Sequence, residues 1–117
     1  PVAAGGSVTP LLVALGGAGG AALRWRLGAR RDSAAFPRGT LLANLAGSLL
    51  LGLLVGLALR GHALALLGTG FCGALTTYSS FAVQAHDLGR RAAAYALVTL
   101  VGSLLLCALG FVVGSRL

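Results

Sequence analysis

The sequence predicts an all-α integral membrane protein with four transmembrane helices, the third of which is broken near its middle. Hydrophobic residues make up 57% of the 117 residues and charged residues only 9%, about a third of the roughly 25% typical of soluble domains. The apolar residues form four long runs, as in chains that cross a membrane several times. The third run carries glycines and hydroxyl groups where an ordinary span would carry aliphatic side chains.

These runs predict a single transmembrane domain that comprises residues 1–117 and contains four spans. We expect the spans at about 8–27, 39–60, 63–86 and 92–115. The first run is short against the roughly 20 residues that a crossing needs. It becomes long enough if Arg24 and Arg26 extend their side chains toward the membrane surface. The first and second spans each carry a set of glycines, and such small faces allow close helix packing in lipid. These glycines are Gly16, Gly17, Gly19 and Gly20 in the first span, and Gly47, Gly52 and Gly56 in the second.

The stretch Gly70–Phe81 lies inside the third span, in a run from Ala63 to Ala85 that contains no charged residue. It holds two glycines, four hydroxyl-bearing Thr and Ser residues and three aromatic rings. Backbone polar groups cannot stay unpaired in hydrocarbon, so this segment must face protein, an ion or water. Broken helices of this kind present carbonyls and amides where ions are bound, which indicates a channel or a transporter.

The charges of the chain flank its apolar runs. All nine basic residues are arginines, and the acidic residues are Asp32 and Asp87. A pI near 11.5 would also suit a nucleic-acid-binding protein. The arginines lie in short connectors without an aromatic-basic surface, however, which favours a multi-pass protein of the cell inner (plasma) membrane and no nucleic-acid partner.

Seven arginines lie at the end of the first span and in the first and third connectors, against two on the other side of the expected membrane. The seven are Arg24, Arg26, Arg30, Arg31, Arg38, Arg90 and Arg91, and the two are Arg60 and Arg116. The positive-inside rule therefore predicts that both termini lie outside.

No residue pattern indicates an enzyme, because the sequence has no carboxylate pair and no base next to a nucleophile. His62 and His86 lie at span ends, where an interfacial position is expected. A coupled pump would normally carry an ionisable group within a span, so passive conduction is the better hypothesis. Cys72 and Cys107 lie in apolar runs, and buried reduced thiols are favoured over a disulfide or a metal pair.

Neutral polar groups inside the spans are the candidate functional residues. Asn44 could form an interhelical hydrogen bond or point its amide into a pathway, and the residue alone favours neither. Tyr95, Thr99 and Ser103 recur at i, i+4 and i+8, which places three hydroxyls along about 12 Å of one helical face. Hydrogen bonds to the carbonyls of their own helix are the alternative. The register of the three favours a role in lining a pathway.

Two aromatic rings complete this set of candidates. Tyr78 and Phe81, three residues apart, share a face if the helix resumes after Thr76. The edge of an aromatic ring is positive, so a ring edge can favour an anion. Packing in the core remains the more common explanation for a single Phe.

Three sequence motifs resemble those of the Fluc (CrcB-type) fluoride channels, over nearly the whole chain. The stretch 16–25 resembles the family motif GGxxGAxxRY, with Trp25 for Tyr, and 39–48 resembles GTLxVNxxGS, with Ala43 for Val. The stretch Gly70–Phe81 resembles GFCGGxTTFSTF, with Tyr78 for the usual Phe. Their order and spacing across four spans make the resemblance specific.

The resemblance implies an antiparallel, dual-topology homodimer with two fluoride pores and passive export of fluoride. It also implies a structural Na⁺ on the two-fold axis, held by the main-chain oxygens of Gly73 and Thr76, in line with the preference of hard cations for oxygen. Arg24 corresponds to the arginine at the end of the family's first helix. The implied pore residues are Asn44, Tyr78, Phe81, Tyr95, Thr99 and Ser103. Because Tyr78 adds a hydroxyl, we expect conduction to differ from that of a Tyr78→Phe variant.

Two other classes of protein share some of these features. A small multidrug-type exporter also has about four helices, but it depends on a membrane-embedded Glu, and this chain contains no Glu. A structural membrane subunit would explain the glycine faces but not the polar groups concentrated in residues 73–81.

Overall fold

The computed structural model describes residues 2–33 and 36–117, with the side chains of 2–7 and 79–80 left out. Within this part the chain is helical almost throughout and contains no β-strand, which confirms the predicted all-α class. The elements are α1 (Val2–Arg31), α2 (Arg38–Gly56), α3 (Gly61–Ala63), η1 (Leu64–Cys72), α4 (Gly73–Leu75), α5 (Ser79–Leu88), η2 (Gly89–Arg91) and α6 (Ala92–Arg116).

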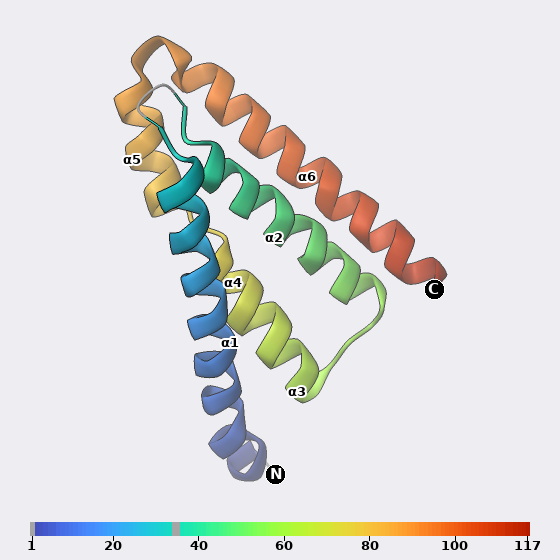
Figure 1. The fold of residues 1–117 in the computed structure, drawn as a ribbon. Coiled ribbons are helices and arrows are strands. Elements are labelled where there is room, and N and C mark those ends of the chain that lie inside the picture. The colour runs from blue at the N-terminus through green and yellow to red at the C-terminus, as the bar shows by residue number, and fades with distance from the viewer. Residues whose placement is uncertain (1, 34–35) are drawn as a thin grey trace.

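The helices converge at one end of the molecule and spread apart toward the other (Figure 1). The continuous helical segment formed by α3, η1 and α4 lies beside α1, and α6 runs along α2. The end of α1, the start of α2, α5 and the start of α6 meet at the converging end (Figure 1). The molecule measures 52 × 30 × 21 Å.

Glycines set the close approach of the helix pairs. A Cβ added at Gly16 would collide with the carbonyl of Leu66 in η1, and one added at Gly52 would collide with the carbonyl of Cys107 in α6. Gly110 of α6 has the same relation to the Leu49 carbonyl of α2. The small faces therefore bring backbones into direct contact, as expected for helices that pack in lipid.

The third span contains two irregularities, one predicted and one not. The helix stops at Leu75, passes through the extended residue Thr76 (φ −78°, ψ 151°) and resumes at Ser79, so the predicted break is present. The segment η1 just before it is a π-helix, a rare form that is frequent at functional sites. Its wider winding leaves no periodic signature in the apolar run, so it could not be predicted from the order of the residues.

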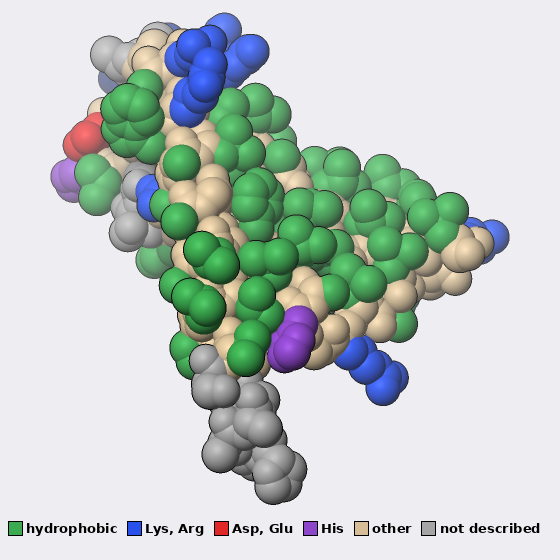
Figure 2. Space-filling view, turned by 60° about the horizontal axis from the view of Figure 1, so that its bottom comes forward, with side chains coloured by type: hydrophobic (Ala, Val, Ile, Leu, Met, Phe, Trp, Pro, Cys, Tyr) green, Lys and Arg blue, Asp and Glu red, His purple; other side chains and the backbone are tan. Residues whose placement is uncertain are grey.

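Two stretches of the described part contain a helix long and apolar enough to cross a membrane: α2, with a mean hydropathy of 1.8, and Phe81–Arg116, with 2.6, which includes α6. The stretch Gly61–Leu75 is apolar but shorter. The outer side of α6 exposes aliphatic side chains, with Leu104 71% exposed and Leu105 65% exposed. Figure 2 shows such side chains covering most of one face, a surface that suits a hydrocarbon environment.

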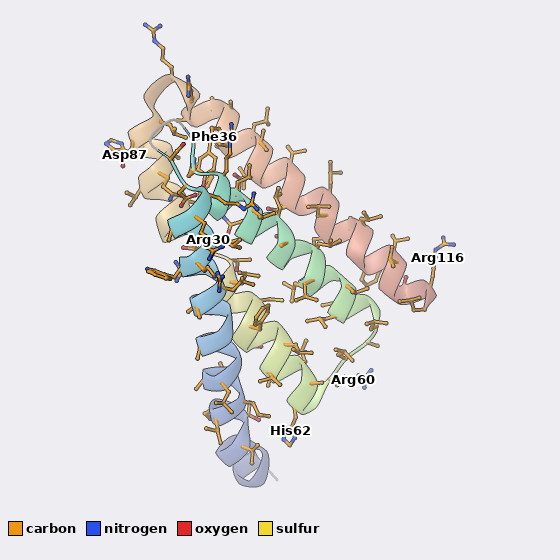
Figure 3. All side chains as sticks on the ribbon, in the orientation of Figure 1. Arg30, Phe36, Arg60, His62, Asp87 and Arg116 are labelled. Carbon is orange, nitrogen blue, oxygen red and sulfur yellow. The ribbon has the colours of Figure 1, made fainter. Side chains whose placement is uncertain are left out.

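Charged side chains lie at the two ends of the molecule (Figure 3). Arg30 and Asp87 lie toward the converging end, whereas Arg60 and Arg116 lie at the opposite, spread end. Both cysteines, Cys72 and Cys107, are free thiols, but only Cys72 is buried as predicted, whereas Cys107 is half-buried.

Candidate functional site

An uncharged groove of about 260 Å³, with polar groups set in a mostly apolar wall, lies between α2, the break and α6. It is lined by amide, hydroxyl and aromatic side chains. The lining residues are Asn44, Ser48, Thr76, Thr77, Tyr78, Phe81, Thr99, Leu100 and Ser103. They include five of the six predicted pore residues, which the fold collects from three segments of the chain.

Asn44, in the second turn of α2, ties this helix to the break. Its Oδ1 accepts a hydrogen bond from Thr77 N at 2.8 Å, and its Nδ2 donates to Thr77 O at 3.2 Å. The second amide hydrogen of Asn44 has no acceptor among the residues that the structure describes. One side chain thus forms the interhelical bond and still keeps a donor at the groove, so the two interpretations of Asn44 are compatible.

Thr99 places an unused hydroxyl at the same groove. The residue is only 6% exposed, and its Oγ1 has no hydrogen-bond partner in the described part of the chain. A buried hydroxyl without a partner costs about 1–3 kcal/mol. The expected alternative, a bond from Thr99 to a carbonyl of its own helix, is therefore not formed.

The predicted hydroxyl track on α6 is divided between two environments. Ser103 and Thr99 line the groove, but Tyr95, one turn earlier, is fully buried beyond its end. The Tyr95 hydroxyl donates to Gln84 Oε1 at 3.2 Å instead of facing the groove.

A row of four aromatic rings closes that end of the groove. The ring centroids of Tyr78 and Phe81 are 6.2 Å apart, and those of Phe81 and Tyr95 are 5.1 Å apart. Phe36, from the connector between α1 and α2, meets Tyr95 edge to face at 5.3 Å. Tyr78, at the other end of the row, is 79% exposed.

Side chains replace the helical hydrogen bonds that the break removes. Arg24 of α1 donates from Nε to the carbonyl of Ala74 at 3.0 Å, and Thr76 Oγ1 donates to the carbonyl of Cys72 at 2.9 Å. Because Thr77 N–H is turned toward Asn44, it does not bind the Gly73 carbonyl. Uncompensated polar groups are costly in a membrane, so these bonds hold the non-helical segment in place.

The predicted cation ligands fit part of a Na⁺ site. In the described part of the chain, neither the Gly73 carbonyl nor the Thr76 carbonyl receives a hydrogen bond. The space beside Gly73 is open, since an added Cβ would meet only the Gly68 carbonyl, at 3.9 Å. Neutral carbonyl oxygens suit a hard cation, but two of them are too few to replace its hydration shell, so a Na⁺ site here would need further ligands from outside this chain.

Sequence reasoning missed a polar cluster behind the aromatic row. It consists of Asp32, Thr40, Gln84 and Tyr95, which are joined by hydrogen bonds. Its members come from four segments of the chain, and no periodicity links such segments. The one available signal was Asp32, the single acidic residue among the arginines of its connector.

An apolar outer surface, a broken helix and a groove with unused donors are features of membrane proteins that conduct or transport ions. The described groove carries none of the ionisable groups that a coupled pump uses.

Comparison with known proteins identifies the family. Residues 11–114 match the family model described as CrcB-like protein, Camphor Resistance (CrcB), and the chain belongs to this family. Fluoride-specific ion channel FluC 2 of Rhodococcus jostii is 57% identical over 84 residues, which cover 71% of this chain and 74% of the relative.

Two further relatives cover more of the chain. Fluoride-specific ion channel FluC 1 of Halobacterium salinarum is 42% identical over 91% of this chain and 95% of its own length. Fluoride-specific ion channel FluC of Bordetella avium is 47% identical over 86% of this chain and 87% of its own length. The expectation that the chain is not an enzyme is confirmed, since these relatives are ion channels.

Proposed function

We propose that this chain forms a fluoride-selective channel of the cell inner (plasma) membrane, through which fluoride leaves the cell passively. The names of the relatives support fluoride as the ion. The groove supports an anion pathway, because its polar side chains are neutral and none of its lining residues is a carboxylate.

The observation that carries the proposal is the pair of unused donors in this groove. Fluoride is small and strongly hydrated, so a pore must replace its water with hydrogen-bond donors. The Thr99 hydroxyl and the second amide hydrogen of Asn44 are such donors, and no residue in the described part of the chain accepts a hydrogen bond from them. The Ser103 hydroxyl and the edges of Tyr78 and Phe81 line the same path.

The open side of the groove supports an oligomeric channel. Tyr78 is 79% exposed, and a polar groove open to lipid would leave its donors and carbonyls without partners. A second copy of the chain would cover the groove. We therefore include a homodimer in the proposal. That it is antiparallel, of dual topology and contains two pores follows from the family resemblance, whereas the seven-to-two distribution of arginines alone favours one orientation.

The same arrangement would complete the cation site. Two copies related by a two-fold axis would bring together four carbonyls, those of Gly73 and Thr76 from each chain. When bound there, Na⁺ would add fixed positive charge near the pores without any titratable group. Arg24, through its bond to Ala74, holds the segment that carries these carbonyls.

The test is fluoride efflux from liposomes that contain the purified protein, measured with a fluoride-selective electrode, with chloride efflux as the control. We expect rapid loss of fluoride while chloride is retained. If protein shown to be folded and dimeric moves neither ion, the channel proposal fails and a structural membrane subunit becomes the better interpretation. Efflux of an organic cation instead would favour the multidrug-type exporter.

A further inference from the structure

Four polar side chains form a continuous hydrogen-bonded chain at the converging end of the molecule, here named the Asp32 relay. Thr40 donates to Asp32 twice, from N at 2.9 Å and from Oγ1 at 2.8 Å. Gln84 Nε2 donates to Asp32 Oδ2 at 3.1 Å and lies 3.0 Å from Thr40 Oγ1. Tyr95 then donates its hydroxyl hydrogen to Gln84 Oε1 at 3.2 Å.

The carboxylate at the head of the relay fixes the direction of every bond in it. An ionised Asp32 can only accept hydrogen bonds, so the Gln84 side chain must turn its NH₂ group toward it. The carbonyl oxygen of the Gln84 amide then faces Tyr95, and this oxygen also only accepts. The Tyr95 hydroxyl must therefore donate its single hydrogen to Gln84.

The relay lies between two cavities. Phe81, whose ring contacts Tyr95, lines the groove on one side. Gln84 lines a smaller cavity of about 120 Å³ on the other side, together with Ser33, Pro37, Asp87 and Leu88. Figure 3 shows Phe36 and Asp87 toward this end of the molecule. Tyr95 is fully buried and lines neither cavity, so it is part of the barrier that an anion leaving the groove at this end would have to cross.

We propose that Asp32 is a positioning residue for fluoride conduction, because it sets the hydrogen-bond polarity of Tyr95. The inference rests on the proposed function and adds a residue that acts without touching the ion. While Asp32 is ionised, Tyr95 presents only the lone pairs of its hydroxyl oxygen to a passing anion. Lone pairs repel fluoride, so the relay lowers the conductance at the end of the polar track.

An asparagine at position 32 removes this constraint with little change in shape. Its side chain has both a donor and an acceptor, so the Gln84 amide can turn either way. When the Gln84 NH₂ group faces Tyr95, the hydroxyl accepts that bond and its hydrogen becomes available to fluoride. Asp32→Asn is thus expected to raise fluoride efflux about tenfold, as for one gained hydrogen bond to a charged acceptor.

A double-mutant experiment in liposomes tests the relay. Fluoride efflux is measured for the unmodified chain, Asp32→Asn, Tyr95→Phe and the double variant. We expect Tyr95→Phe alone to raise efflux slightly, because it removes the oxygen lone pairs that face the ion, whereas a loss of the Tyr95 hydrogen has no effect while Gln84 uses it. In the Asp32→Asn background the same change should abolish the gain. A purely structural role of Asp32 would not make the effect of Tyr95→Phe depend on residue 32.

Asp87→Asn is the matched control. It removes the other carboxylate of the chain, at the same end of the molecule and beside Gln84, but leaves the relay unchanged. Equal gains from Asp32→Asn and Asp87→Asn would overturn the proposal in favour of a simple charge effect. An unchanged efflux in Asp32→Asn, or an equal loss from Tyr95→Phe in both backgrounds, would also overturn it.

A second variant tests the relay if Asp32→Asn does not fold, and a second measurement tests it if no variant conducts fluoride. Gln84→Leu removes the acceptor of the Tyr95 hydrogen without touching Asp32, so it should give the same Tyr95-dependent gain if Asp32→Asn does not fold. The infrared C–O stretching band of Tyr95, assigned by difference against Tyr95→Phe, reports whether the hydroxyl donates. A band that is the same in the unmodified chain and in Asp32→Asn contradicts the relay even if no variant conducts, whereas absent efflux with a shifted band contradicts only the proposed function.

Discussion

At the scale of single residues, Thr99 combines burial with an unused hydrogen bond, a costly state that a purely structural residue would not need. We predict that Thr99→Val leaves the protein as stable or raises its free energy of unfolding by about 1 kcal/mol, because the unsatisfied hydroxyl is removed. The same change should lower fluoride efflux by about tenfold or more, since a donor to the ion is lost. Thermal unfolding in detergent and efflux from liposomes measure the two effects.

Thr99→Ser is the control, because it keeps the hydroxyl and loses only a methyl group. It should retain most of the efflux of the unmodified chain. If Thr99→Val conducted as well as Thr99→Ser, the Thr99 hydroxyl would have no part in conduction.

Most residues that line the candidate groove could be predicted from the sequence, but the hydrogen bond of Tyr95 and the role of Asp32 could not. Asn44, Thr99 and Ser103 stand out because polar groups are rare in apolar spans. Tyr95 fits the same spacing, but its hydroxyl donates to Gln84 instead of facing the groove. This could not be predicted, because the bond depends on a side chain from another helix. Asp32 could not be assigned, because its partner Gln84 lies 52 residues away in the sequence.

At the scale of elements, the contact of α1 with η1 depends on individual glycines. We predict that Gly16→Ala prevents normal folding or dimerisation, because the added methyl group would collide with the backbone of Leu66 in η1. Backbone atoms cannot move aside as a flexible side chain can, so the helices must separate. Size-exclusion chromatography in detergent and thermal unfolding measure the effect.

Gly17→Ala is the matched control, on the neighbouring residue of the same helix. A Cβ at Gly17 would meet the Gly70 carbonyl at 3.8 Å and the Ala74 Cβ at 3.9 Å, which are ordinary contacts. Equal losses of stability in the two variants would contradict the packing described for α1 and η1.

The helices themselves were largely predictable, because apolar runs separated by short connectors mark them in the sequence. The break was predictable from the glycines and hydroxyls of Gly70–Phe81, which suit neither lipid nor an ordinary helix. The π-helical winding of η1 was not. Such winding depends on how the backbone packs against α1, and the order of apolar residues does not encode that contact.

At the scale of the whole molecule, the proposed Na⁺ links two chains and should stabilise their assembly. We predict that replacing Na⁺ with a large organic cation lowers the thermal unfolding temperature of the purified protein, because the carbonyls of Gly73 and Thr76 lose their ligand. A Gly73→Ala variant should lose this dependence on Na⁺, since the methyl group would occupy the open space beside Gly73. An unfolding temperature that does not depend on Na⁺ would contradict the proposed Na⁺ site.

The proposed function requires that fluoride passes through the groove between α2, the break and α6. The most direct test is fluoride efflux from liposomes with Ser103→Phe, whose ring would fill the groove, compared with Leu105→Phe on the lipid-exposed side of α6. We predict that Ser103→Phe blocks efflux and that Leu105→Phe conducts like the unmodified chain. Undiminished efflux through folded Ser103→Phe protein would contradict the claim and place the pathway elsewhere in the molecule.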